Sequence, residues 1–282
     1  MQAAPSLSVV LPCYRSAVLA EESANRLAEF LTRVGMSYEI LVVDDGGGDF
    51  AREAFADRDD VRLVRLERNR GKGAAVRAGM LAARGEVRVF TDVDLPYDLD
   101  LIVVMRECII GQGYHLVIGD RTLPGSAYAE VTSGKRRAAS ALFSAFVGRL
   151  VTGGFFDTQC GLKALRGDLA DLIFPLVQID RFAFDVELVY IALKHRLDIK
   201  RIPVQLRNNQ TSTVRLFRDS ARGVADVFRI KYHQLRGHYS GEAIDQLLHS
   251  EFVEMRHRVI HESGADSPAS ADESALPRVH AR

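Results

Sequence analysis

The sequence lacks the features of nucleic-acid-binding, secreted and membrane-spanning proteins. Its 37 basic and 37 acidic residues cancel, so no overall positive field favours nucleic acid. The three cysteines (Cys13, Cys108 and Cys160) are odd in number and lack metal-ligand spacing, which is typical of core positions in a reducing compartment. No basic segment precedes the first apolar run, and no stretch reaches about 18 uninterrupted apolar residues. We therefore expect neither a secretory signal nor a membrane-spanning helix.

The remaining composition is that of an ordinary globular protein. With 282 residues, 47% of them hydrophobic and 26% charged, the chain can form one large domain or two small ones. Short apolar runs predict strands at 7–11 (closed by Pro12), 38–43, 61–66, 87–90 and 115–119. Segments of helical periodicity lie between these runs. The alternation predicts an α/β fold with a Rossmann-like, doubly wound and mostly parallel sheet flanked by helices.

The first expected helix follows Ser16, a candidate cap, and stops at Gly35. Further helices are expected at 73–83, 99–110, 133–151 and 184–196, with a strand at 199–204 and a C-terminal amphipathic helix at 216–235. Residues 262–282 are rich in Ser, Ala and Asp, a composition typical of a disordered tail.

Polar or glycine-rich turns follow four of the expected strands. They are Pro12-Cys13-Tyr14, Asp44-Asp45, the 69–73 segment and Asp92-Val93-Asp94. In parallel α/β sheets, ligands bind outside the carboxyl ends of the strands. The four turns therefore predict one binding site at that edge.

Asp92 and Asp94 follow a buried strand one residue apart. While the backbone stays extended, the two side chains point the same way. Two carboxylates aimed together repel unless a cation neutralises them, and their oxygens suit Mg²⁺ or Mn²⁺. The alternative is that both are ordinary loop acids.

Several of these segments resemble motifs of one known family. They are Val10-Leu11-Pro12-Cys13-Tyr14, Val43-Asp44-Asp45-Gly46, Asn69-Arg70-Gly71-Lys72-Gly73 and Thr91-Asp92-Val93-Asp94-Leu95. In this order they resemble family-2 glycosyltransferases of the GT-A fold. Gly119-Asp120-Arg121, the 157–163 segment and Phe184-Asp185-Val186-Glu187-Leu188 are similar to the dolichyl-phosphate β-glucosyltransferase branch among polyprenyl-phosphate glycosyltransferases. The resemblance spans about residues 6–213.

The resemblance implies an inverting, metal-dependent hexosyltransferase that uses Mg²⁺ or Mn²⁺. The expected donor is UDP-glucose, and the expected acceptor is a polyprenyl or dolichyl phosphate. The same chemistry on a soluble acceptor (a small acid, a natural product or a protein) is an open alternative. A sugar nucleotidyltransferase and a non-catalytic nucleotide-sugar-binding module are weaker ones.

The resemblance also assigns roles to residues. Asp157 and Asp94 are expected to be catalytic, and Asp94 and Asp92 to hold the metal ion. Pro96 replaces a polar residue that often serves as a ligand in relatives, so water and diphosphate oxygens complete the expected metal shell. The residues expected to bind the nucleotide sugar are Pro12, Tyr14, Asp44, Asp45, Gly71, Lys72, Asp92 and Arg121. Those expected on the acceptor side are Arg136, Lys163, Asp185 and Glu187.

Each role has a structural alternative. Asp44-Asp45-Gly46 is a good turn sequence, and Lys72 is as readily a solvated lysine at a helix start. Arg121 fits a phosphate clamp or a surface salt bridge equally well. Asp157 would abstract a proton from a hydroxyl acceptor, orient a phosphate acceptor, or serve as a cap. Asp185 and Glu187 face different ways on a helix, so one is expected at the site and the other in solvent.

The sequence also leaves the membrane question open. The expected helix near 215–236 carries six basic and two acidic residues, which suits either peripheral contact with anionic lipid or a core-packed helix with a solvated face. We expect a cytoplasmic location, with contact at the inner face of the cell membrane as the alternative. The expected domains are a GT-A domain at 6–213 (nucleotide-sugar half 6–122, acceptor half 123–213), a helical segment at 214–261 and the tail. The oligomeric state is not predicted.

Overall fold

A computed structural model describes residues 4–51, 53–126, 151, 157–206 and 216–262. The chain divides into two compact units, Met1–Gly241 and Glu242–Arg282. The acceptor-side residue Arg136 lies outside the described residues, as do residues 133–150 of the expected helix at 133–151 and residues 263–282 of the expected tail at 262–282.

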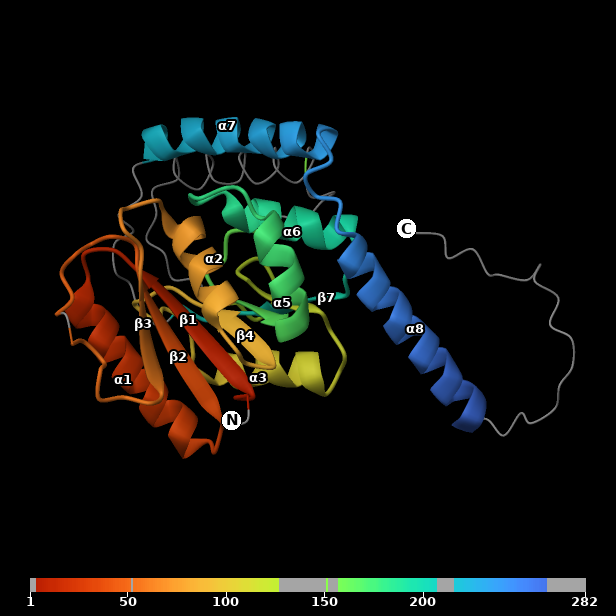
Figure 1. Cartoon of the computed structure of the whole chain (residues 1–282), viewed down its shortest axis with the longest axis horizontal. Helices are drawn as coiled ribbons and strands as arrows, with labels where there is room; N and C mark the ends of the chain where they lie inside the picture. Colours follow the sequence, from red (N-terminus) through yellow and green to blue (C-terminus); the bar gives the residue numbers. More distant parts are fainter. Residues whose placement is uncertain (1–3, 52, 127–150, 152–156, 207–215, 263–282) are drawn as a thin grey trace, which may run out of the picture. The chain divides into compact units, whose positions relative to one another are not determined.

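The first unit is built on a seven-stranded sheet in the order β3-β2-β1-β4-β6-β5-β7. Figure 1 shows β3, β2, β1 and β4 side by side. The strands are β1 (Leu7–Cys13), β2 (Tyr38–Asp44), β3 (Val61–Arg65), β4 (Val87–Phe90), β5 (Leu116–Asp120), β6 (Lys163–Arg166) and β7 (Ile199–Pro203). All pairings are parallel except those of β6, which runs antiparallel to β4 and β5. The prediction of a mostly parallel, Rossmann-like sheet is confirmed.

Strand β1 continues through Pro12 instead of closing there, because Pro12 still pairs with Val43 of β2. On its other side, β4 accompanies β1 only as far as Val10. Beyond that point β1 has a partner on one side alone, so the missing N–H of Pro12 interrupts no ladder.

Helices cover both faces of the sheet. Helices α1 (Ala17–Arg33) and α3 (Asp100–Ile110) pack on the face that buries Leu7, Val9 and Leu11 of β1. Helix α2 (Lys72–Ala82) covers the other face, where Gly79 lies against Val10 and Val43. Helices α5 (Gly167–Ile173) and α6 (Phe184–Lys194) lie on the same side as α2, joined by the 3₁₀ helix η1 (Phe174–Leu176).

The expected start and end of α1 are only partly confirmed. Ser16 occupies the N-cap position, but its side chain makes no capping bond. The amide of Ala17 instead donates to Asp49 Oδ2 at 2.9 Å, so a carboxylate from a later loop caps the helix. After the helix, Gly35 has φ of +71°, as expected for a glycine stop.

Helix α7 (Leu216–Leu235) has the expected bounds, and it buries Val227 and Ile230. Helix α8 (Glu242–Glu262) belongs to the second unit. Among the described residues, none of the helices combines the length and the apolar character needed to span a membrane.

Candidate active site

Asp92 and Asp94 lie in a tight turn after β4, not in extended backbone as the sequence argument assumed. The amide of Leu95 donates to the carbonyl of Asp92 at 3.0 Å, and Leu95 has φ of +46°. The alternation argument was therefore wrong, although the two carboxylates still lie close enough for the charge of Asp92 to raise the pKa of Asp94.

Both oxygens of Asp92 are already in close contact with the protein. Its Oδ1 lies 2.6 Å from Lys72 Nζ. On the other side, a Cβ added at Gly161 would lie only 2.1 Å from Oδ2, so the glycine backbone packs directly against the carboxylate. Burial alone would raise the pKa of Asp92, but the charges of Lys72, Lys163 and Arg121 hold it below its usual range.

Asp94 is the open carboxylate of the pair. Its pKa is raised, first by burial and then by the charge of Asp92. Among the described residues, none forms an ion pair or a side-chain hydrogen bond with it. The amide of Asp94 and the charge of Lys72 offset this rise only in part, and an added cation would relieve the remainder.

The charged residues around Asp92 continue into the interior of the protein. They are Lys72, Asp185 and Lys163. Lys163 Nζ is fully buried, donates to the carbonyl of Cys160 at 2.6 Å and pairs with Asp185. Burial raises the pKa of Asp185 despite both lysines. For Lys72, burial acts to lower the pKa, but Asp92 and Asp185 together raise it. Lys72 is therefore a charged, paired lysine and not a solvated one.

Asp157 is held by Arg121 through three hydrogen bonds. The guanidinium donates from Nε at 2.9 Å and from an Nη at 2.8 Å, and the Arg121 amide donates at 2.8 Å. Burial alone would raise the pKa of Asp157, but Arg121 keeps it below its usual range. A carboxylate in this state is a weak base and a well-oriented acceptor of hydrogen bonds.

Asp44 and Asp45 instead accept bonds from backbone amides. Asp44 accepts from Gly47 at 2.7 Å and Gly48 at 3.4 Å, and Asp45 accepts from Arg70 at 2.8 Å and Gly71 at 2.7 Å. Burial raises the pKa of Asp45. Asp44 thus closes a local turn, whereas Asp45 holds the distant segment that leads into α2. Their role toward a nucleotide stays a prediction.

The glycines at the start of α2 have close protein neighbours. At Gly71, with φ of +118°, a Cβ would lie 2.6 Å from the carbonyl of Asp180, and at Gly73 it would lie 2.5 Å from the carbonyl of Ile179. Ala74 donates to the Asp180 carbonyl at 3.0 Å. These glycines make room for the 179–181 segment, a contact that the sequence did not indicate.

Glu187 is buried, so the expectation that one of the two helix acids is solvated was wrong. Its Oε2 accepts from the amides of Gln178 at 2.9 Å and Ile179 at 2.7 Å. Its Oε1 accepts from the hydroxyl of Tyr239 at 2.6 Å. Burial raises its pKa. Asp185 pairs with Lys163, whereas Glu187 connects the 178–179 segment to Tyr239 through hydrogen bonds.

Pro12 and Tyr14 lie at the end of β1. Pro12 is buried in the strand, and Tyr14 is 42% exposed with the guanidinium of Arg15 5.2 Å from its ring centre. Their role toward a nucleotide stays a prediction.

Sequence reasoning missed three further groups near these residues. Asp120 is fully buried and pairs with Arg201 while accepting from Thr122, Asp180 pairs with both Arg70 and Arg77, and Gly161 packs on Asp92. An Asp two residues before a Thr is a turn signal that could have marked Asp120. The other two contacts leave no local signal, because their partners are distant in the sequence.

The carboxylates of Asp92 and Asp94 fit a hard divalent cation only in part. No three His, Cys, Asp or Glu side chains of the described residues form a ligand group. Mg²⁺, however, is commonly bound by one or two carboxylates together with substrate phosphates and water. Asp94, with Asp92 beside it, meets that pattern.

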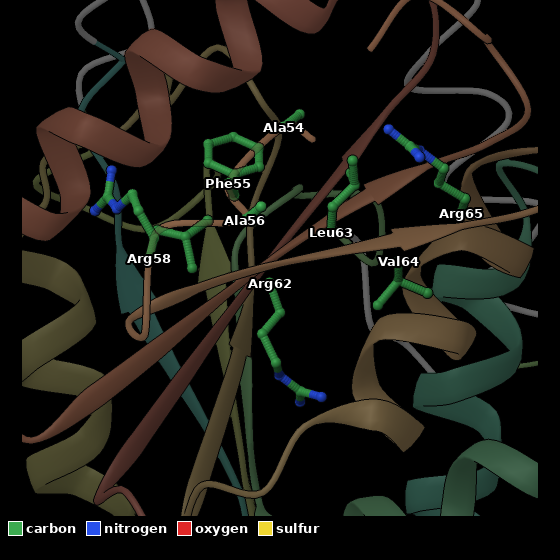
Figure 2. A pocket seen from close by; sticks show the side chains of 9 residues that line it. Ala54, Phe55, Ala56, Arg58, Arg62, Leu63, Val64 and Arg65 are labelled. Carbon is green, nitrogen blue, oxygen red and sulfur yellow. The ribbon is translucent and has the colours of Figure 1, made fainter. Parts of the chain in front are cut away.

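A separate depression of about 370 Å³ lies along the edge strand β3. Figure 2 shows Arg58, Arg62 and Arg65 pointing in different directions around it. Arg58 pairs with Asp60, Arg62 with Glu39, and Arg65 contacts the carbonyl of Ala51. Because its cations are already engaged, we assign this depression no binding role.

Comparisons with known proteins identify the family of the chain and its fold. The chain is 30% identical to dolichyl-phosphate β-glucosyltransferase of Dictyostelium discoideum over 82% of this chain and 75% of the relative. It is also 30% identical to the enzyme of that name from Homo sapiens, over 82% of this chain and 76% of the relative.

A similar solved structure is glucosyl-3-phosphoglycerate synthase from Mycobacterium tuberculosis in complex with Mn²⁺, UDP and glucosyl-3-phosphoglycerate. It has a TM-score of 0.57 at 21% identity, covering 79% of this chain and 78% of that chain. At this identity the likeness establishes the fold, which is GT-A. The model of glycosyl transferase family 2 matches residues 8–173, from β1 through α5. The chain therefore belongs to glycosyl transferase family 2.

Proposed function

We propose that this protein transfers glucose, with inversion, from UDP-glucose to a dolichyl or related polyprenyl phosphate. Two relatives at 30% identity over 82% of the chain carry the name dolichyl-phosphate β-glucosyltransferase, which supports this donor and acceptor. The geometry adds one observation that bears on the acceptor, namely the pairing of Asp157 with Arg121.

In the proposed reaction, an oxygen of the acceptor phosphate forms a bond to C1 of glucose. The bond between C1 and the diphosphate breaks, and UDP leaves with its electron pair. A phosphate monoester has its second pKa near ~6, so at neutral pH the attacking group is already ionised and no proton has to be removed. A hydroxyl acceptor would need a general base.

The state of Asp157 favours the phosphate acceptor. Arg121 takes up both carboxylate oxygens and keeps the pKa of Asp157 low, so Asp157 is poorly suited to remove a proton. We propose that Asp157 orients Arg121, which then has its backbone and side chain fixed at the end of β5. Asp157 would thus act on the acceptor phosphate through Arg121.

We assign Asp94, with Asp92, to the divalent cation, and Lys72 to the donor diphosphate. When bound, Mg²⁺ or Mn²⁺ neutralises charge on the leaving diphosphate. Asp44 and Asp45 hold the backbone on the nucleotide side through hydrogen bonds from Gly47 and Gly71. Asp185, which pairs with the buried Lys163, stabilises the charge of Lys72. Pro12, Tyr14 and Gly71 keep their proposed place on the nucleotide side.

Helix α7 supports a further proposal, contact with an anionic membrane surface at which a lipid phosphate lies. Phe228 and Leu235 are 60% and 86% exposed, Arg229 and Lys231 lie in the same part of the helix, and Arg236 directly follows it. Exposed apolar side chains among basic ones suit a lipid headgroup layer. The proposed location is the cytoplasmic face of the membrane.

The experiment offers labelled UDP-glucose and Mg²⁺ or Mn²⁺ to the purified full chain. The acceptors are dolichyl phosphate in detergent, dolichol without the phosphate, and 3-phosphoglycerate. We expect label in the organic phase with dolichyl phosphate alone. Label that appears only on 3-phosphoglycerate would contradict the lipid acceptor, and equal transfer to dolichol would contradict the phosphate nucleophile.

A further inference from the structure

The contacts of Asp92 and Asp94 differ in a way that matters for cation binding. Asp92 Oδ1 is paired with Lys72 at 2.6 Å, and its Oδ2 is covered by Gly161. Asp94 has no such contact among the described residues. A divalent cation can therefore reach Asp94 directly, whereas at Asp92 Oδ1 it meets the positive charge of the Lys72 ammonium group.

A divalent cation and an ammonium group on the same carboxylate oxygen repel each other, and in a half-buried site this repulsion is several times that in water. Cation binding at Asp92 therefore favours movement of Lys72 away from it. The side chain is suited to this movement, since it is a compact charge on a flexible four-carbon stem.

The surroundings of Lys72 keep it in the site once it has moved. Asp185 lies close enough to Lys72 to act on its charge, and Asp185 is itself fixed by the buried Lys163. The backbone of Lys72 opens α2 directly after Gly71, which is held by Asp45. Only the stem of Lys72 has to turn, and a diphosphate at the strand ends offers it new oxygen partners.

We propose that Lys72 is an exchangeable cation, which neutralises Asp92 in the ligand-free enzyme and transfers to the donor diphosphate when the metal ion binds. Metal and nucleotide then bind with positive cooperativity beyond their direct contact with each other. The lysine prevents tight metal binding until the diphosphate is present. This inference rests on the proposed metal site.

The test measures Mn²⁺ affinity by the electron paramagnetic resonance signal of free Mn²⁺, with and without UDP. In the natural chain we expect weak binding without UDP and a gain with UDP within the usual coupling range of about 5 to 150-fold. In Lys72→Met we expect Mn²⁺ to bind at least about tenfold more tightly without UDP, and the gain with UDP to shrink. Lys200→Met, which removes a lysine stacked on Tyr114 instead, is the matched control and should match the natural chain.

Two outcomes separate the inference from the function on which it rests. If the natural chain binds no Mn²⁺ even with UDP, the proposed metal site is wrong. If it binds Mn²⁺ with UDP, and Lys72→Met leaves the UDP-free affinity unchanged, the metal site stands and the exchange is wrong. Lys72→Gln, an uncharged variant that can still bond to Asp92, gives the same comparison if Lys72→Met does not fold.

Discussion

Two regions at the carboxyl edge of the sheet neutralise their carboxylates in different ways. At the end of β2, Asp44 and Asp45 accept bonds from backbone amides, which cannot move without changing the turn. After β4, Asp92 pairs with a lysine side chain, and Asp94 has no partner among the described residues. An acid bound to backbone amides stabilises the fold, whereas an acid paired with a partly exposed lysine can exchange its partner. The comparison predicts which changes affect stability and which affect catalysis.

The largest expected effect is on stability, at the buried pair of Lys163 and Asp185. Both side chains are almost fully buried, so Lys163→Met leaves an uncompensated carboxylate and should lower the free energy of unfolding by about 3–5 kcal/mol. Urea unfolding measures the loss. The double variant Lys163→Met with Asp185→Leu should recover much of it, and no recovery would contradict the explanation by unpaired charge.

The next effect is on catalysis, at the open acid. Asp94→Asn should lower kcat/KM for glucose transfer about 10²–10³-fold, because charge on the leaving diphosphate loses its stabilisation. Its melting temperature should change little, since no described partner is lost. Asp100→Asn, at the exposed start of α3, is the matched control. Unchanged turnover in Asp94→Asn would remove Asp94 from the proposed metal site.

A smaller effect is expected at an amide-bound acid, Glu187. Tyr239→Phe removes one of its three donors and should cost about 1–3 kcal/mol of stability, because a buried carboxylate oxygen is left unsatisfied. Tyr232→Phe changes a tyrosine that is 52% exposed and should leave stability unchanged. Equal melting temperatures for the two variants would contradict this role of Tyr239.

The smallest effect is on the pH dependence of stability, which should have opposite signs for Asp157 and Glu187. The pKa of Asp157 is lowered in the folded state, so its contribution is present above the unfolded value of about 3.9 and is lost as pH falls through the folded pKa. The pKa of Glu187 is raised, so its ionisation weakens the fold, and stability is regained as pH falls from neutral toward about 4.3.

Urea titrations between neutral and acid pH check this difference. The stability advantage of the natural chain over Asp157→Asn should shrink as pH falls, whereas its stability relative to Glu187→Gln should rise. The same slope for both variants would mean that the two kinds of carboxylate do not differ as described.

The sequence was a good guide to the strands and to which turns meet at the edge of the sheet. Apolar runs located β1 to β5, and the bounds of α7 follow from its amphipathic pattern. The local pattern did not show that β6 runs antiparallel, because strand direction depends on where the chain returns. The extended conformation assumed for Asp92 to Asp94 also failed, because the chain turns directly after Thr91.

The candidate residues were located better than their partners. Asp157 and Lys72 were named, but Arg121 lies 36 residues from Asp157, and each pairing depends on tertiary structure. Gly71 was named for the nucleotide side, but its contact with the 179–181 segment could not be predicted from the sequence. Spacing along the chain indicates which side chains reach one edge, but it does not say what neutralises them there.

The hydrogen bond between Tyr239 and Glu187 has a practical consequence for shortened forms of the enzyme. Glu187 also holds the amides of Gln178 and Ile179, and the next residue, Asp180, accepts from Ala74 in the first turn of α2. A protein ended at residue 213, where the family resemblance stops, would lack the hydroxyl that completes this connection. Shortened proteins made for crystallisation or assay should therefore extend past Tyr239, because the segment that follows α7 helps to fix the place where Lys72 begins its helix.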